Sequence, residues 1–202
     1  MIRSLLPAPL PTGKLRDNLW VVRDGFVNLY VMQGPGGLVC VDAGWRPARV
    51  RSAFADLGLN PTDVVAVLLT HTHWDHAWGV DAFPAATRLA AGSSRCNPVA
   101  DGEILTLAGL RVRVIACPGH TTDSMAYVVE DVGLFTGDTL WLRGGQAYPY
   151  PSWFNRNNGV LRNSLRQLAC LDGLGSLFTG HTGFAQDAAQ ALHPWLREKE
   201  SR

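Results

Sequence analysis

The feature that most constrains this chain is the string Thr70-His71-Thr72-His73-Trp74-Asp75-His76, which holds three histidines and one aspartate. It directly follows residues 64–69, a continuous apolar run that is typical of a strand covered on both faces. In an extended segment, residues two apart point to the same side, so the first two histidines can converge. A turn that begins near the tryptophan makes the side chains of the aspartate and the third histidine point in a neighbouring direction. One short segment can therefore offer two pairs of ligands.

The residue types in this string favour metal binding. Neutral imidazole and carboxylate are ligands that zinc, iron and manganese accept, whereas the four scattered cysteines offer no thiolate site. Three crowded imidazoles without a metal would repel one another on protonation or would need separate hydrogen-bond partners. We therefore predict a metal site at the end of a buried strand.

Three later segments share a second pattern, in which an expected strand end is followed by glycine and then by a ligand-type residue. Glycine lets the backbone turn sharply where a strand stops, so the next side chain is directed across the sheet edge. These segments are Cys117-Pro118-Gly119-His120, Phe135-Thr136-Gly137-Asp138 and Phe178-Thr179-Gly180-His181. Together with the first string they use five of the six histidines. The sixth, His193, is assigned to the surface or to packing.

Composition limits the partners of this chain. Its 202 residues are 47% hydrophobic and 17% charged, as in ordinary globular proteins, and we expect one domain over residues 1–202. The net charge of +1 is not gathered into blocks, so no nucleic-acid partner is expected. No apolar run approaches the roughly 20 residues that cross a bilayer, so no membrane partner is expected either. We expect a small-molecule substrate and a monomer or homodimer.

Cysteine usage indicates the compartment. Cys40, Cys96, Cys117 and Cys170 fall at irregular spacings without a C-x-x-C pair, which predicts neither a disulfide framework nor a zinc ribbon. We expect reduced thiols in a cytoplasmic protein. Cys117, three residues before His120, is expected to be a buried neighbour of the site rather than a nucleophile.

The order of the expected elements indicates an α+β fold. Runs at residues 19–22, 27–32 and 38–42 predict a meander, followed by a helix over 47–58 and the strand at 64–69. Further strands are expected near 88–91, 110–116, 125–130, 133–136 and 177–179, with helices over 160–171 and about 184–197. Two packed sheets with helices outside would account for this order, although periodicity alone also fits other α+β arrangements.

Taken together, H-x-H-x-D-H, Gly-His, Gly-Asp and a second Gly-His resemble the metallo-β-lactamase superfamily, from about residue 19 to 183. The resemblance implies an αββα four-layer sandwich of two mixed β-sheets with outer helices. It also implies two divalent metal ions at the edge between the sheets, with zinc expected and iron or manganese also accommodated. By position, the first metal is held by His71, His73 and His120, and the second by Asp75, His76 and His181.

Two aspartates gain roles from the same resemblance. Asp138 matches the aspartate that bridges the two metals, and Asp42 matches a strand-end residue that supports a ligand from outside. The implied reaction is hydrolysis by a metal-bound hydroxide, with Asp138 and Asp75 as catalytic residues and Asp75 also orienting the hydroxide. We expect the substrate to be a small ester, thioester or lactone.

Asp138 also indicates the branch of the superfamily. Glyoxalase II, lactonases, ribonuclease Z and phosphodiesterases have aspartate here, whereas true β-lactamases have cysteine or serine. The residues after His181 suffice for one helix, so we expect a glyoxalase II-like or lactonase-like hydrolase rather than glyoxalase II itself. No basic arm of the ribonuclease Z type is present. A phosphodiesterase, a persulfide dioxygenase-like enzyme with one iron and a non-enzymatic metal-binding protein stay open as alternatives.

The segment between residues 141 and 158 is predicted to be an aromatic and glycine-rich loop that forms a substrate wall. Tyr148 or Tyr150 in it could donate to a developing oxyanion. Trp78 and Asp123 depart from the usual motifs of the superfamily. We expect Trp78 to fill space beside the site and Asp123 to cap or brace a turn. Aromatic residues expected near the mouth are Trp45, Trp74, Trp78, Trp141, Tyr148, Tyr150, Trp153 and Phe154.

Overall fold

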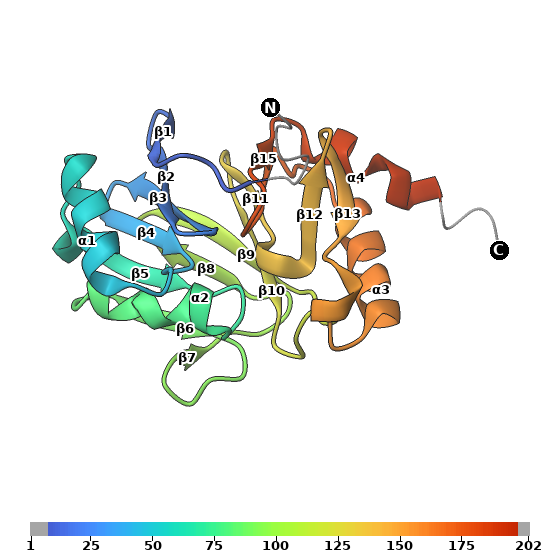
Figure 1. Ribbon diagram of the computed structural model, residues 1–202, viewed down its shortest axis with the longest axis horizontal. Coiled ribbons are helices and arrows are strands. Elements are labelled where there is room, and N and C mark those ends of the chain that lie inside the picture. Colours follow the sequence, from blue (N-terminus) through green and yellow to red (C-terminus); the bar gives the residue numbers. More distant parts are fainter. Residues whose placement is uncertain (1–7, 198–202) are drawn as a thin grey trace, which may run out of the picture.

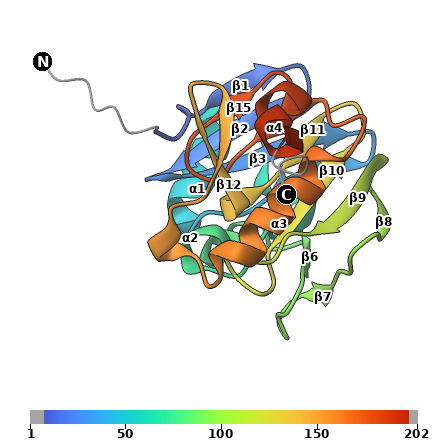
Figure 2. The same ribbon diagram turned by 90° about the vertical axis from the view of Figure 1, so that its right-hand side faces the viewer.

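Two β-sheets packed face to face form the centre of the fold, with helices on both outer faces. A computed structural model describes residues 8–197. In Figure 1 the layers run from left to right as helix α1, the first sheet, the second sheet and the helix pair α3 and α4. Figure 2 shows α3 and α4 in front of the second sheet. The expected four-layer α+β sandwich is therefore confirmed.

The first sheet has seven strands in the order β1-β2-β3-β4-β5-β6-β7. Strands β1 to β4 are antiparallel, and β4 to β7 run parallel, so the sheet is mixed. The elements of this half are β1 (Gly13–Arg16), β2 (Leu19–Asp24), β3 (Val27–Gly34), β4 (Gly37–Val41), α1 (Pro47–Asp56), η1 (Pro61–Asp63), β5 (Val64–Leu68), α2 (Trp74–Ala77), η2 (Trp78–Ala82), β6 (Thr87–Ala90) and β7 (Asn97–Pro98).

The second sheet has six strands in the order β15-β14-β11-β10-β9-β8, and a separate two-stranded sheet pairs β12 with β13. Only β11 and β14 are parallel neighbours in the second sheet, so this sheet is mixed as well. The elements of this half are β8 (Ile104–Leu107), β9 (Leu110–Ala116), β10 (Met125–Val129), β11 (Gly133–Phe135), η3 (Gly137–Thr139), β12 (Leu140–Arg143), β13 (Gln146–Pro149), η4 (Ser152–Phe154), α3 (Asn158–Ala169), β14 (Ser176–Phe178), β15 (Phe184–Ala185) and α4 (Ala188–Arg197).

No helix within residues 8–197 is long and apolar enough to span a membrane.

Three buried apolar clusters hold the four layers together. The cluster between the sheets combines residues of both halves, including Tyr30, Leu68, Tyr127 and Phe178. A second cluster lies under α1, whose Val50 and Phe54 are fully buried. The third lies between the second sheet and the helices α3 and α4. Because apolar burial is the dominant favourable term in folding, these clusters fix the relative position of the sheets.

The expectation of a loop over residues 141–158 is wrong in part. Its first half is the hairpin β12–β13, whose Leu142 and Ala147 pack toward α3 and α4. The indole Nε1 of Trp195 donates to the carbonyl of Ala147 at 2.9 Å. The glycines, prolines and aromatics of this segment hide the alternation of buried residues that marks a strand.

The last helix also begins later than predicted. Phe184 and Ala185 pair with β14 as the short strand β15, and α4 starts at Ala188. The short strands β1, β7 and β8 were not expected. Each lies at or near a sheet edge and has few buried side chains, so its sequence lacks the apolar run by which the central strands are identified.

Candidate metal centre

All seven residues with expected ligand roles lie together at one edge of the sandwich. His71, His73, Asp75 and His76 follow β5, on its loop and on α2. His120, Asp138 and His181 follow β9, β11 and β14. These three strands run in the same direction in the second sheet, so their carboxyl ends meet at the same edge. The topology therefore converts segments far apart in sequence into one cluster.

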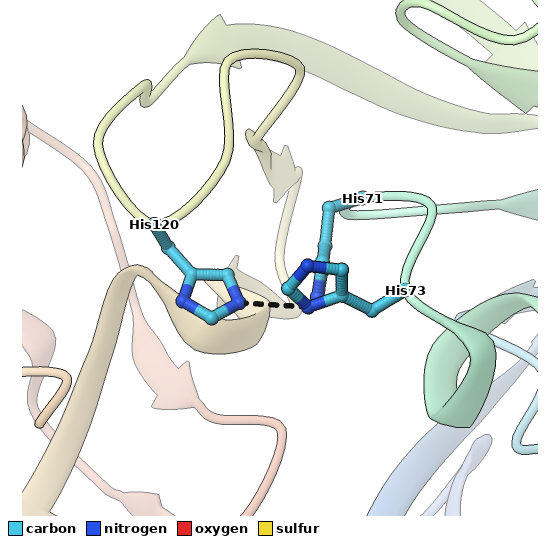
Figure 3. A group of neighbouring side chains, drawn as sticks. All are labelled: His71, His73 and His120. Carbon is cyan, nitrogen blue, oxygen red and sulfur yellow. Dashed lines mark hydrogen bonds between the residues drawn. The ribbon is translucent and has the colours of Figure 1, made fainter. Parts of the chain in front are cut away.

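The donor atoms form three overlapping groups. In each group one atom per residue lies within 4.8 Å of the others. Figure 3 shows the first group: His71 and His73 come from one loop, and His120 points toward them from a loop on the other side. His120 Nε2 lies 3.0 Å from His73 Nδ1. The groups are His71, His73 and His120; His71, His76 and Asp138; and Asp75, His76 and His181.

The carboxylate of Asp138 lies between histidines of the different groups. Its Oδ1 is 3.3 Å from His76 Nε2, and its Oδ2 is 3.2 Å from His181 Nε2 and 3.6 Å from His120 Nε2. The side chain is buried and contacts donors from both halves of the molecule. No other carboxylate of the cluster has this central position, since Asp75 Oδ2 lies 3.5 Å from His181 and 3.8 Å from His76.

Four of the five imidazoles are held from behind through Nδ1. For His76, Nδ1 lies 2.7 Å from Asp42 Oδ2, and for His181 it lies 2.7 Å from the carbonyl oxygen of Phe26. Carboxylate and carbonyl oxygens only accept, so Nδ1 carries the proton in both rings and Nε2 faces the cluster. The remaining two contacts are His120 Nδ1 to Asn155 Oδ1 at 3.2 Å and His71 Nδ1 to Thr70 Oγ1 at 3.1 Å. Such outer contacts orient metal-binding histidines.

Asp42 organises the first half of the cluster. Besides His76 it accepts from the backbone N–H of Thr70 at 2.8 Å and from the Thr70 hydroxyl at 3.0 Å. Its own backbone lies in the left-handed region with φ +61°, which non-glycine residues rarely adopt. The conformation is held because the buried carboxylate has these donors around it. Asp42 thus occupies the supporting position that the sequence resemblance implies.

The chemistry of the donor set fits a metal ion. His71 Nε2 is buried and has no hydrogen-bond partner among the described residues. A buried polar atom without a partner costs about 1–3 kcal/mol unless a ligand satisfies it. The inward nitrogens also lie close to one another, as in the pair His76 Nε2 and His181 Nε2 at 3.3 Å. When the lone pairs of several imidazole nitrogens point to one position, a cation at that position can bind all of them.

Charge is distributed unevenly over the cluster. Burial favours neutral His76, but the carboxylates of Asp138 and Asp42 outweigh it and hold its pKa well above the ordinary value. Burial likewise opposes ionisation of Asp138, yet the imidazoles of His181 and His76 hold its pKa well below the ordinary value. Burial and the charge of His76 lower the pKa of His71. Without a metal, protons on imidazoles therefore balance the central carboxylate, and a bound cation would replace them.

The glycines before the ligands act in two different ways. Gly137 has φ +51°, and a Cβ there would lie 2.2 Å from Thr70 Oγ1. Gly180 does not have a positive φ, but a Cβ there would lie 2.6 Å from Asp138 Oδ1 and 2.7 Å from His76 Cε1. The sharp turn expected after each strand thus applies at Gly137, whereas Gly180 is needed for the close approach of its strand to the cluster.

A cavity of about 730 Å³ opens above the cluster. It is lined by cluster members and by Pro9, Phe26, Trp74, Trp141, Tyr150, Pro151, Trp153, Phe154 and Thr182. Of the two tyrosines considered from sequence, Tyr150 lines this cavity, whereas Tyr148 is exposed and contacts Gln146. Burial, and then the carboxylates of Asp138 and Asp75, raise the pKa of Tyr150. Tyr150 therefore keeps its proton and can donate a hydrogen bond.

Several other expectations can be compared with the structure. Trp45 and Trp78 line a separate cavity, and Trp78 is 66% exposed, so it does not fill space beside the cluster. Asp123 accepts from the Thr72 hydroxyl at 2.8 Å and braces the histidine loop as expected. Cys117 is buried, and burial raises its pKa, in agreement with a packing role. His193 is exposed.

Sequence reasoning missed Asn155 and Phe26. Asn155 donates through Nδ2 to the carbonyl of Tyr150 at 2.7 Å, which leaves its oxygen to accept from His120. Phe26 lies in the β2–β3 turn, supplies a carbonyl to His181 and stacks on its ring with centroids 5.7 Å apart. Neither residue belongs to a ligand-type pattern, and both act across more than 30 positions of sequence, so no local signal marks them.

Comparison with known proteins agrees with the geometry. The sequence model of the metallo-β-lactamase superfamily matches residues 22–95. A hydroxyacylglutathione hydrolase of Xanthomonas oryzae pv. oryzae (strain MAFF 311018) is 34% identical over 166 residues, which are 78% of this chain and 61% of the relative. The similarity of this chain is therefore to the metallo-β-lactamase superfamily. Within this superfamily, a second hydroxyacylglutathione hydrolase, from Xylella fastidiosa (strain M12), is 36% identical over 148 residues, 67% of this chain and 52% of the relative.

Solved structures of the superfamily show the same fold. A metallo-β-lactamase family protein from Thermus thermophilus superposes with a TM-score of 0.69 at 25% identity, covering 93% of this chain and 81% of that one. A B3 metallo-β-lactamase with an active-site glutamic acid gives a TM-score of 0.72 at 20% identity, with 96% and 93% covered. The chain spans about three fifths of the length of the first hydroxyacylglutathione hydrolase that it matches.

Proposed function

We propose that this chain is a metal-dependent hydrolase that holds two divalent ions, with zinc expected, and cleaves a small ester, thioester or lactone. The observation that carries the proposal is the central position of Asp138. Its two oxygens lie 3.2–3.6 Å from histidines that belong to different donor groups. A carboxylate in that position suits two neighbouring cations that share one ligand. The names of the relatives from Xanthomonas and Xylella support thioester hydrolysis as one of the candidate reactions.

The ligand assignment follows the donor groups. His71, His73 and His120 would hold one ion, and Asp75, His76 and His181 the other, with Asp138 shared. When bound, the ions would supply Lewis acidity at the carbonyl oxygen and an activated water as nucleophile. The fixed Nδ1 contacts of His76 and His181 keep their Nε2 atoms directed inward.

Two side chains of the cavity would act on the substrate. Asp75 lies in the cavity wall beside His181, where its carboxylate can orient the attacking water and accept its proton. Tyr150 lies with its ring 5.1 Å from that of His120, and its retained proton can stabilise a developing oxyanion. Hydrolysis then needs no serine or cysteine nucleophile.

Metal analysis combined with a substrate panel tests the proposal. Purified protein loaded with zinc, manganese or iron is assayed with a carboxylic ester, a thioester, a lactone and bis(p-nitrophenyl) phosphate, and oxygen uptake is followed with a thiol persulfide. We expect two ions per chain and turnover of at least one carboxylic substrate. One iron per chain with oxygen uptake and no hydrolysis would overturn the proposal. Turnover of the phosphodiester alone would replace it with a phosphodiesterase.

Replacement of the shared carboxylate gives a second test. Asp138→Ala should lower metal content toward zero ions per chain and turnover by at least about a thousandfold, because both groups lose a ligand. The fold should persist, since the sheets are held by apolar clusters away from the cluster of ligands. Asp172→Ala removes an exposed carboxylate and serves as the control. Near-normal activity of Asp138→Ala would exclude a shared role.

A further inference from the structure

We propose that the cavity above the cluster selects an uncharged substrate with an apolar acyl group, and that glutathione thioesters are poor substrates. This inference rests on the proposed hydrolase function and narrows it to a substrate class. It is carried by the side chains that form the two sides of the cavity and by the charges that the cavity contains.

Aromatic rings form both sides of the cavity. The first wall consists of Phe26, from the β2–β3 turn, and Trp74, the first residue of α2, in edge contact with centroids 5.8 Å apart. The second wall consists of Tyr150, Trp153 and Phe154 on and before η4. Phe154 lies 5.8 Å from Tyr150 and 5.9 Å from Trp153, measured between ring centroids. The two walls come from opposite halves of the chain and face the same cavity.

These rings are unusually exposed for aromatic residues. Trp153 is 77% exposed, Phe154 58%, Phe26 46% and Trp74 42%. Exposed apolar side chains that gather in one place mark binding surfaces, whereas packing would bury them. The walls also reach the cluster: Phe26 stacks on His181, and Tyr150 contacts His120 and His181. An apolar group lying along the walls would therefore extend directly from the reacting centre.

The described walls of the cavity offer no basic side chain to a strongly anionic substrate tail. None of its lining residues within the described part of the chain is lysine or arginine, and the charged side chains are Asp75 and Asp138. The nearby Arg46 pairs with Asp24 at 2.6 Å and lies over the ring of Trp45. Glutathione carries two carboxylates and one ammonium group beyond its thioester. The aromatic walls offer these charges no ionic partner, which costs binding free energy.

The size of the cavity fits this substrate class. Its volume of about 730 Å³ falls within the range of small-molecule sites, which is roughly 300–1,000 Å³. Burial of each methylene contributes about 0.8 kcal/mol, which is roughly fourfold in an equilibrium or rate ratio. An acyl chain of several carbons along the walls should thus gain markedly over acetyl.

Matched thioesters test the inference through kcat/KM. Acetyl, butyryl and hexanoyl groups are placed on N-acetylcysteamine, which is neutral, and on glutathione, and hydrolysis by the metal-loaded protein is followed. We expect kcat/KM to rise at least about tenfold from acetyl to hexanoyl. For the same acyl group, the glutathione thioester should be at least about tenfold worse than the neutral one. A flat dependence on chain length, or a preference for glutathione, would overturn the inference.

Binding provides a readout that does not depend on catalysis. S-hexyl-N-acetylcysteamine and S-hexylglutathione are thioethers that cannot be hydrolysed, and Trp74, Trp141 and Trp153 in the cavity report binding by fluorescence. We expect the neutral thioether to bind at least about tenfold more tightly. If it does while no substrate of the panel is cleaved, the proposed hydrolase function fails and the cavity preference stands. Equal or tighter binding of S-hexylglutathione overturns the preference, whatever the turnover.

Variants of the second wall localise the effect. Trp153→Ala and Phe154→Ala should each reduce the hexanoyl-to-acetyl ratio of kcat/KM about fivefold, because they remove apolar contact area. Both side chains are exposed, so folding should be little affected. Ile104→Ala is the matched control, since Ile104 is 47% exposed on β8 and does not line the cavity. An unchanged ratio in both wall variants would contradict the assignment of this wall.

Discussion

At the scale of single residues, the candidate metal centre depends on partners that lie behind the ligands. His76, His181, His120 and His71 each use Nδ1 for an outer contact, and those contacts involve a carboxylate, a backbone carbonyl, an amide and a hydroxyl. The outer partners differ in chemical type because each imidazole contacts the group that its own surroundings provide. What the contacts share is the direction of the inner nitrogen, and this is the property that metal binding requires.

Asp42→Asn tests this outer layer. The carboxylate accepts three hydrogen bonds, from His76 and twice from Thr70, and an amide in its place turns an NH₂ group toward one of these donors. We expect metal affinity to fall by about 10–100-fold, measured by competition with a chromogenic chelator. Asp172→Asn changes an exposed carboxylate and should leave the affinity unchanged. Wild-type affinity in Asp42→Asn would mean that His76 is oriented by packing alone.

At the scale of elements, the centre is made by strand ends and the turns that follow them. Strands β4 and β5 place Asp42 and the histidine string at one edge, and β9, β11 and β14 place the other ligands opposite. The loops can approach closely because a glycine has no side chain, whereas a Cβ at these positions would overlap the neighbouring loop. At Gly180 a Cβ would meet the ligand side chains themselves, 2.6 Å from Asp138 Oδ1 and 2.7 Å from His76 Cε1.

Gly180→Ala should therefore damage the centre from outside its ligand set. The added Cβ would overlap Asp138 and His76, and overpacking of this kind costs about 1–3 kcal/mol. We expect weaker metal binding, measured by bound metal per chain, together with a lower unfolding midpoint. Gly102→Ala provides the control, because nothing lies within 4 Å of a Cβ there, although its φ of +77° carries a backbone cost. Equal metal content in both variants would argue against the crowding at Gly180.

At the scale of the whole molecule, the cluster joins the two halves of the sandwich. Four of the seven residues follow the first sheet and three follow strands of the second. A cation held there would be bound by the folded chain and not by the unfolded one, because the ligands meet only when the sheets pack together. Metal binding and folding are then linked thermodynamically.

Removal of metal should consequently destabilise the protein. At free metal one hundredfold above Kd, one bound ion adds about 2.7 kcal/mol to the free energy of unfolding. We expect urea unfolding of the chelator-treated protein to occur at a lower midpoint than that of the loaded protein. In Asp138→Ala the difference between the two preparations should shrink. Coincident curves for loaded and chelated wild-type protein would contradict the linkage.

The identity of the donor residues and the strands that carry them could be read from local patterns. The crowded histidines after residues 64–69 and the Gly-His and Gly-Asp pairs each depend on neighbours in sequence, as does the apolar period of α1. These features can be predicted from sequence because they depend only on residue type and short-range spacing. The hairpin β12–β13 lacked a clear period and was missed for that reason.

Only the tertiary structure decided which donors meet, what holds them and what surrounds them. His120 and Asn155 are 35 positions apart, and His181 and Phe26 are 155 apart, so their contacts exist only in the folded tertiary structure. The role of Gly180 and the separation of Trp78 from the cavity are likewise distances through space. Packing sets such distances collectively, through all three apolar clusters at once, and no short stretch of sequence contains them.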